Sequence, residues 1–307
     1  MLNGLISVLV VFVILAVGFF FTHKKIWPEN TNQVFSITVV QIAAPALAII
    51  SIENRFTPQL LHRSVLNLVI IVASIFIMLA LGKLLAHLLS LQNGKKAVFE
   101  VTFTFNNTMF IGLPIIQIVF GNDGLPYLFT FYLATIVLFW TIGAYTLSKA
   151  SSMEDASFSI KKIFSPGLVG VIIGCVLVEM EMQLPLILET SLTYLSNICV
   201  PLSLLVIGSN LSKSWSKGFT KITIDQVIIM LGKFVVHPLI VFILFKIAGV
   251  NGLPLHVFIL TAAMPCHAQT AILAQFYEVE GEYASNLVSL STLISLITIP
   301  IYANLLL

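Results

Sequence analysis

The sequence predicts an all-helical membrane protein with ten transmembrane helices in two inverted five-helix repeats. Three observations lead to this prediction: the composition, the placement of basic residues and an internal repeat. Hydrophobic residues make up 58% of the 307-residue chain and charged residues only 9%, whereas soluble domains contain about 25% charged residues. So few ions cannot cover a surface that faces water, and a net charge of +2 is too small for a nucleic-acid partner. A water-soluble enzyme, a disordered chain and a nucleic-acid-binding protein are therefore disfavoured.

Ten apolar stretches follow one another, each near the roughly 20 residues that a bilayer-spanning helix needs. They lie at 2–22, 32–52, 64–89, 97–120, 125–147, 163–180, 185–211, 222–248, 253–276 and 283–306. The first stretch has no basic residue before it and is followed by His23, Lys24 and Lys25. A cleavable signal peptide has the opposite arrangement, so we interpret this stretch as the first membrane helix. The predicted units are a first repeat at 1–148, a cytoplasmic connector at 149–162 and a second repeat at 163–307.

Basic residues are concentrated in alternate connections between these stretches. The even-numbered connections contain only Arg55 and Arg63. The odd-numbered ones contain ten lysines: Lys24, Lys25, Lys95, Lys96, Lys149, Lys161, Lys162, Lys213, Lys217 and Lys221. Because short cytoplasmic loops carry an excess of Lys and Arg, the odd connections are expected in the cytoplasm. Both termini are then outside, and the chain is a multi-pass protein of the cell membrane.

An internal repeat relates the two halves at an offset of 156–159 residues. A proline preceded four residues earlier by an amide occurs as Gln41/Pro45 in the second stretch and as Asn197/Pro201 in the seventh. Further matches pair NLVII (67–71) with DQVII (225–229), and the stretch beginning at Val98 with that beginning at Val257. Five helices are an odd number, so the second unit must be inverted, as in many secondary transporters. The two amide–proline pairs either face a substrate path or are simple packing polars.

The fourth and ninth stretches contain polar and helix-breaking residues at mid-span. The expected substrate-binding residues are Asn106, Asn107, Thr108, Gly112 and Pro114 in the fourth, and Pro265, His267, Gln269 and Thr270 in the ninth. Proline removes a helix hydrogen bond and asparagine competes for others. Two broken helices in corresponding positions of inverted halves indicate a binding site, and half-helix N-termini favour an anion. The alternative is a pair of ordinary proline kinks.

These residues also carry a family resemblance. The segment NNTMFIGLP resembles the NTxxxGxP signature of the auxin efflux carrier family, and STLISLITIP resembles its last helix. The resemblance implies crossed broken helices 4 and 9, and an elevator-type transport domain of helices 3–5 and 8–10. That domain would move against a scaffold of helices 1, 2, 6 and 7, through which family members form homodimers. The short connector resembles the compact bacterial malate/malonate permease-like type. His267 departs from the small residue that is more usual at its position.

Three ionisable residues inside predicted helices are candidates for charge balance or coupling. Lys233 lies about 11 residues into its helix, roughly 16 Å deep at 1.5 Å per residue. An ionisable residue at that depth is by default functional. It either balances the substrate or acts as a fixed internal cation, and the alternative is a structural pair with Asp225 or Glu100. Glu100 and Asp225 lie about one turn inside the cytoplasmic face, where they are candidates for a proton or gating site. His267 either titrates or donates a hydrogen bond as a neutral ring.

We therefore expect a secondary transporter for a small organic anion, such as a malate- or malonate-like dicarboxylate, that works by alternating access. An enzyme is disfavoured because the chain has no HExxH, GxSxG or acidic metal cluster, and neither a cofactor nor a metal is expected. The breaks contain no carboxylate, which favours coupling to H⁺, or uniport, over Na⁺. A sodium-coupled organic anion symporter, a channel and a receptor on the same fold stay open as alternatives.

Overall fold

The computed structural model describes residues 2–151, 164–217 and 222–307. Apart from one isolated bridge between Asn106 and Cys266, the ordered elements of this part of the chain are helices. The connector predicted at 149–162 lies, from residue 152 onward, outside the described residues. The prediction of an all-helical chain is confirmed.

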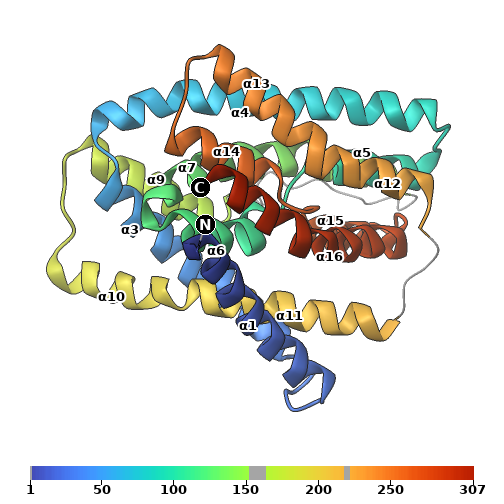
Figure 1. Cartoon of the computed structure of the whole chain (residues 1–307), viewed down its shortest axis with the longest axis horizontal. Helices are drawn as coiled ribbons and strands as arrows, with labels where there is room; N and C mark the ends of the chain where they lie inside the picture. Colours follow the sequence, from blue (N-terminus) through green and yellow to red (C-terminus); the bar gives the residue numbers. More distant parts are fainter. Residues whose placement is uncertain (1, 152–163, 218–221) are drawn as a thin grey trace.

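The helices of the first half coincide with the first five apolar stretches (Figure 1). In chain order they are α1 (Leu2–His23), α2 (Thr31–Thr38), η1 (Val39–Ala43), α3 (Ala44–Arg55), α4 (Pro58–Leu88), α5 (Asn93–Thr104), η2 (Thr108–Gly112), α6 (Leu113–Phe120), η3 (Asn122–Gly124), α7 (Leu125–Leu138), η4 (Phe139–Gly143) and α8 (Ala144–Lys149). The elements η1, η2 and η4 are π-helical turns, and η3 is a 3₁₀ turn.

The second half is helical as well. Its helices are α9 (Pro166–Glu179), α10 (Leu186–Asn197), α11 (Cys199–Lys217), α12 (Ile224–Leu231), the π-helical turn η6 (Gly232–Val236), α13 (His237–Ile247), α14 (Leu253–Ala262), α15 (Ala268–Phe276) and α16 (Gly281–Leu306). The connections α3–α4 and α9–α10 lie at one end of the bundle, and α4–α5 lies at the other (Figure 1).

Prolines determine where several of these helices are irregular. Pro45, Pro114 and Pro238 each stand at the second position of a helix that follows a π-helical turn. Proline has no N–H and clashes with the carbonyl four residues earlier, so the preceding turn widens into a π-bulge. Proline at the first position instead starts a helix, as at Pro58 and Pro166, where no N–H is needed.

Length and apolarity support a membrane location. In the described residues six helical stretches are long and apolar enough to cross a membrane: 31–55, 58–88, 122–149, 186–213, 224–247 and 281–306. Four shorter apolar helices cover 10–23, 108–120, 166–179 and 253–262. Of these shorter helices, 108–120 and 253–262 belong to the two broken stretches, whereas 10–23 and 166–179 belong to the first helix of each half. The chain is therefore an all-helical membrane protein.

Two helix pairs pack so closely that only glycine fits between them. On α11, a Cβ added to Gly208 would lie 2.1 Å from the carbonyl oxygen of Leu15 on α1. On α9, a Cβ added to Gly170 would lie 2.7 Å from the carbonyl oxygen of Pro45 on α3. The helix α10 also packs on α3, so α1, α2, η1, α3, α9, α10 and α11 form one connected set. The remaining helices pack mainly on one another, with α4 against α5, α7 and α13, and α15 against α16.

Candidate functional site

The two broken helices meet at their breaks and cross there. The helix α5 ends at Thr104 and α14 ends at Ala262, and in each case the chain continues without helical bonds before the next helix begins. The Asn107 N–H donates to the Pro265 carbonyl at 2.8 Å, and the His267 N–H donates to the Phe105 carbonyl at 3.1 Å. The donors Asn107 and His267 are 160 residues apart in the chain, and so are the acceptors Phe105 and Pro265. The two bonds form an isolated antiparallel bridge centred on Asn106 and Cys266.

The same offset relates the side chains that cap the helices after the breaks. The Asn107 Oδ1 accepts from the Phe110 N–H at 3.1 Å at the start of η2. The His267 Nδ1 accepts from the Gln269 N–H at 3.3 Å at the start of α15. Since Nδ1 is an acceptor, the proton of the neutral imidazole is on Nε2. The His267 ring also stacks on Phe139, with centroids 4.2 Å apart. The ring thus accepts a hydrogen bond through Nδ1, whereas the sequence led us to consider a titrating ring or a neutral ring that donates one.

Lys233 lies behind the crossing and binds the groups that the break leaves without helical partners. Its fully buried ε-ammonium donates to the Phe105 carbonyl at 2.8 Å and to the Asn106 Oδ1 at 2.5 Å. The Asn106 Nδ2 in turn donates to the Ala262 carbonyl at 2.7 Å, at the open end of α14. A structural pairing of Lys233 with Asp225 or Glu100 is therefore wrong. The Phe105 carbonyl and the Asn106 side-chain oxygen take the place of the carboxylate that the sequence led us to consider.

Two further polar residues hold the crossing. The His237 Nδ1 is 3.1 Å from the Asn106 Nδ2, and its Nε2 is 3.5 Å from the Ser74 Oγ. The Ser291 Oγ accepts from the Cys266 N–H at 3.1 Å. Both residues come from helices far along the chain, and nothing in the sequence placed their side chains at the breaks.

A cavity of about 70 Å³ lies between the crossing and the helices η1 and α9. Of the predicted site residues, Asn107, His267 and Gln269 line it. Its other lining residues are Val40, Met109, Phe110, Tyr132, Ile136, Trp140, Ser165, Gly167 and Ala268. The Tyr132 hydroxyl and the Ser165 Oγ are 3.1 Å apart. The cavity thus has a polar end at the two helix caps, a second polar group at Tyr132 and Ser165, and apolar walls.

The other predicted binding residues surround the crossing without lining this cavity. Asn106 uses both ends of its amide on protein groups, and the Pro265 carbonyl is occupied by Asn107. The Gly112 N–H donates to the Asn107 carbonyl at 3.0 Å, and Pro114 lies in the first turn of α6. The remaining two, Thr108 and Thr270, have buried hydroxyls with no hydrogen-bond partner in the described part of the chain.

The two acidic candidates lie away from the cavity. The Asp225 carboxylate is 3.3 Å from the Lys95 ε-ammonium and accepts a hydrogen bond from the Tyr283 hydroxyl. Glu100 is buried on α5 and forms no ion pair with another described residue. None of the residues that line the cavity is acidic.

The paired amides and prolines of the second and seventh stretches also lie outside the cavity. Gln41 and Asn197 are exposed on η1 and at the end of α10. Pro45 and Pro201 are in the first turns of α3 and α11. Val40, the neighbour of Gln41, is the residue of this region that reaches the cavity.

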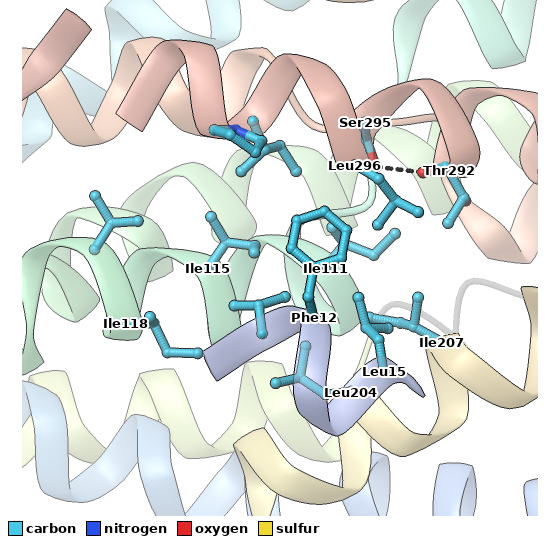
Figure 2. Close-up of a pocket in the computed structure, with 14 residues that line it drawn as sticks. Phe12, Leu15, Ile111, Ile115, Ile118, Leu204, Ile207, Thr292, Ser295 and Leu296 are labelled. Atoms are coloured by element: carbon cyan, nitrogen blue, oxygen red, sulfur yellow. Dashed lines mark hydrogen bonds between the residues drawn. The ribbon is translucent and has the colours of Figure 1, made fainter. Parts of the chain in front are cut away.

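A second, smaller cavity separates α1 and α11 from α6 and α16 (Figure 2). Phe12 and Leu15 face Ile111 and Ile115 across it, and the Ser295 hydroxyl is turned back to the Thr292 carbonyl at 2.6 Å. Its volume is about 30 Å³ and no polar atom is exposed to it. An apolar space of this size offers nothing that would recognise an anion.

Interrupted helices that meet inside an apolar bundle are typical of secondary transporters. The chain belongs to the membrane transport protein family, the auxin efflux carrier family that its motifs resemble, with the family pattern matching residues 4–303. It is similar to an uncharacterized transporter of Methanocaldococcus jannaschii, with 26% identity over 304 residues that cover 98% of each chain. It is also similar to an uncharacterized transporter of Methanothermobacter thermautotrophicus, with 24% identity over 301 residues that cover 97% of this chain and 96% of the relative. The family and these relatives are transporters and not enzymes.

Proposed function

We propose that this protein is a secondary transporter that moves a small organic anion across the cell membrane by elevator-type alternating access. In this proposal ten helices cross the membrane as two inverted repeats. A scaffold group (α1, α2, η1, α3, α9, α10 and α11) stays in place. A transport group (α4–α8 and α12–α16 with their π-turns) carries the substrate past it.

The packing of α1 and α9 supports the inverted repeat. The first helix of one half, α1, packs through Gly18 on the backbone of Leu205 in α11. The first helix of the other half, α9, packs through Gly174 on Ile52 and Ala48 in α3. Each half thus places its first helix against the second helix of the other half. Such an exchange is expected when two inverted units share an approximate two-fold axis in the membrane plane.

The single observation that carries the proposal is the pair of capped helix starts facing one cavity. Helix N-termini present N–H groups and a partial positive charge, which favour a carboxylate. Asn107, His267 and Gln269 stand at these starts and line the cavity. The second polar group, Tyr132 with Ser165, is suited to the other carboxylate of a malate- or malonate-like dicarboxylate. Met109 and Ile136 supply an apolar wall for the carbon skeleton.

The position of Lys233 favours coupling to H⁺, or uniport, over Na⁺. A sodium ion needs several converging oxygens, often with carboxylates. At the crossing, the Phe105 carbonyl and the Asn106 amide oxygen converge on the lysine ammonium instead. In this proposal the Lys233 ammonium provides the positive charge that a bound cation would otherwise provide at the crossing, so no sodium is required. Homodimerisation through the scaffold group is part of the same proposal.

Flux into proteoliposomes tests the proposal. With unlabelled malate or malonate inside and the labelled acid outside, we expect saturable uptake that shows counterflow and persists without sodium. Asn107→Ala and Gln269→Ala should each reduce the flux at least about tenfold, because a truncated carboxylate ligand costs 1.4 kcal/mol or more. The matched control is Gln41→Ala, which removes an exposed amide beside the cavity and should leave flux unchanged.

The other possible results separate the alternatives. Binding of the acids in a thermal-shift assay without flux would indicate a receptor, and flux that does not saturate would indicate a channel. Loss of uptake in sodium-free medium, at fixed pH and membrane potential, would replace the proton-coupled or uniport mechanism by sodium symport.

A further inference from the structure

Two ion pairs join the scaffold group to the transport group at one end of the molecule. Arg55, the last residue of α3, pairs with Asp123 in the turn η3 between α6 and α7. The His62 Nε2, in the second turn of α4, lies 3.1 Å from the carboxylate of Glu179, the last residue of α9; this hydrogen bond is an ion pair when the imidazole is protonated. In each pair one residue belongs to the scaffold group and the other to the transport group.

The two ion pairs flank the link between the groups: one involves a residue just before the link and the other a residue just after it. Helix α3 of the scaffold group is joined to α4 of the transport group by two residues only, Phe56 and Thr57. Before this link the scaffold's Arg55 binds the transport group, and after it the transport group's His62 binds the scaffold. If the groups move relative to each other, this link must change direction, and both ion pairs resist that change.

The opposite end of the molecule has no equivalent within the described residues. There, Lys95 at the start of α5 pairs with Asp225 at the start of α12, at 3.3 Å, and both belong to the transport group. The cavity also lies toward that end, since Ser165 and Gly167 stand at the start of α9 whereas Glu179 ends it. At 1.5 Å per residue, the start and end of α9 are roughly 20 Å apart. Within the described residues, the ion pairs between the two groups therefore lie at the end remote from the cavity, whereas at the cavity the groups share the neutral Tyr132–Ser165 hydrogen bond.

We propose that Arg55–Asp123 and His62–Glu179 form an electrostatic clasp that holds the transport group in the position seen here. The clasp must open before the crossing can reach the other side of the membrane. This inference rests on the proposed function, because it assigns a role in alternating access to residues that touch neither the cavity nor the crossing.

The expected strength of the clasp is suited to an equilibrium between two positions of the transport group. All four side chains are between 42% and 68% exposed. Exposed ion pairs shift an equilibrium by at most about fivefold each. Independent pairs multiply, so both together bias the two positions by up to about 25-fold. That is enough to make one position predominant and small enough for substrate binding to reverse it.

Distances between spin labels test the clasp independently of transport. Labels on Gln183→Cys, in the α9–α10 connection, and Asn251→Cys, in the α13–α14 connection, report on the scaffold and transport groups. Cys175→Ala removes the one native cysteine that is partly exposed. In the otherwise unchanged chain we expect one predominant distance. Arg55→Gln combined with Glu179→Gln should raise a second distance population several-fold.

Two controls separate the clasp from general damage. Lys95→Gln breaks the ion pair that stays inside the transport group and should leave the distance distribution unchanged. Arg55→Asp combined with Asp123→Arg reverses one pair and should restore the single predominant distance. High salt should act like the clasp variants, because it screens exposed charges, and should add nothing in the variants themselves.

An unchanged distribution in the clasp variants, in protein that still transports, would overturn the clasp and leave the proposed function intact. A changed distribution that the reversed pair does not restore would also overturn it. Absence of flux in every variant and in the parent protein, with the distances responding to the clasp substitutions as expected, would instead overturn the proposed function.

Discussion

At the scale of single residues, Asn107 and His267 perform one task with different chemistry. Each accepts a backbone N–H at the start of a half-helix, and each stands at the equivalent position of the crossing. Asparagine is among the preferred capping residues, whereas histidine is not. The imidazole serves here because its ring is held in place by stacking on Phe139. Both positions require a side chain that accepts a hydrogen bond from the backbone N–H, and the charge of that side chain is less important.

His267→Asn should therefore preserve the protein where His267→Ala does not. Asparagine keeps a side-chain acceptor, so we expect thermal stability and flux to stay near those of the parent. Alanine removes the cap and should lower the free energy of unfolding by about 1 kcal/mol, within the range of 0.5–2 kcal/mol seen for lost caps. Thermal unfolding in detergent measures the difference. Loss of stability with both variants would show that the stacked ring, and not the cap, is what His267 contributes.

Ser291 offers a second test, because it satisfies a buried backbone group that has no helical partner. Ser291→Ala leaves the Cys266 N–H without an acceptor and should cost about 1–3 kcal/mol of stability. Ser295→Ala is the matched control: it is equally buried and one turn further along α16. The Ser295 hydroxyl only donates to a helical carbonyl, so this change leaves no donor unpaired. Equal melting temperatures for the two variants would contradict the role of Ser291 at the break.

Sequence reasoning predicts one side of the proposed site and not the other. Asn107, His267 and Gln269 could be predicted because polar residues are conspicuous in an apolar stretch that also contains helix breakers. Tyr132 and Ser165 were not predicted, since a tyrosine in an apolar helix and a serine before a proline have ordinary explanations. Their approach to the breaks depends on how distant helices pack.

At the scale of helices, the positions of breaks and bulges follow from local chemistry, whereas the partners of each helix do not. The prolines at 45, 114 and 238 mark three π-helical turns in the structure. The sequence offered Asp225 or Glu100 as a structural partner of Lys233 only as an alternative, and the structure gives the lysine the Phe105 carbonyl and the Asn106 amide oxygen instead. The carbonyl and amide oxygens that bind it become available only after the fourth and ninth stretches cross, and a linear sequence does not show which backbone groups a crossing leaves free.

Close helix packing gives a prediction at this scale. Gly208→Ala on α11 would place a Cβ 2.1 Å from the Leu15 carbonyl oxygen, so α1 and α11 must separate. Overpacking of this kind costs about 1–3 kcal/mol. Gly82→Ala on α4 is the control, because its Cβ would lie 3.2 Å from the Phe103 side chain and at an ordinary 3.6 Å from the Glu100 carbonyl oxygen. Alanine also gains up to about 1 kcal/mol in helix propensity. Thermal unfolding in detergent compares them. A stable Gly208→Ala protein would mean that the two helices are not in the contact described.

At the scale of the whole molecule, the contacts between the two groups differ from the contacts within them. Between α1, α11, α6 and α16 the atoms exposed to the small cavity are apolar, because the hydroxyls of Thr292 and Ser295 are bonded within α16 (Figure 2). Dispersion contacts have no preferred direction, so apolar surfaces can slide without leaving a buried polar group unpaired. Within the transport group, by contrast, buried hydrogen bonds hold the crossing together. This distribution suits a rigid carrier moving along an apolar seam.

The orientation of that movement depends on how the chain is threaded through the membrane. The proposed ten crossings would place both ends of the chain on one side, and the lysines of the odd connections predict that this side is outside. A cysteine at Asn251, between α13 and α14, or at Leu307 should therefore react with a membrane-impermeant maleimide added to intact cells. A cysteine at Gln92, between α4 and α5, should react only after permeabilisation. All three positions are exposed in the fold, so a difference in labelling reports the side of the membrane and not burial. Labelling of Gln92→Cys and Leu307→Cys from the same side would require an even number of crossings between them, whereas the proposed ten-helix arrangement places seven there. That labelling result would contradict the proposed two-fold relation between the halves, and the pairing of the two helix starts at the crossing depends on this relation.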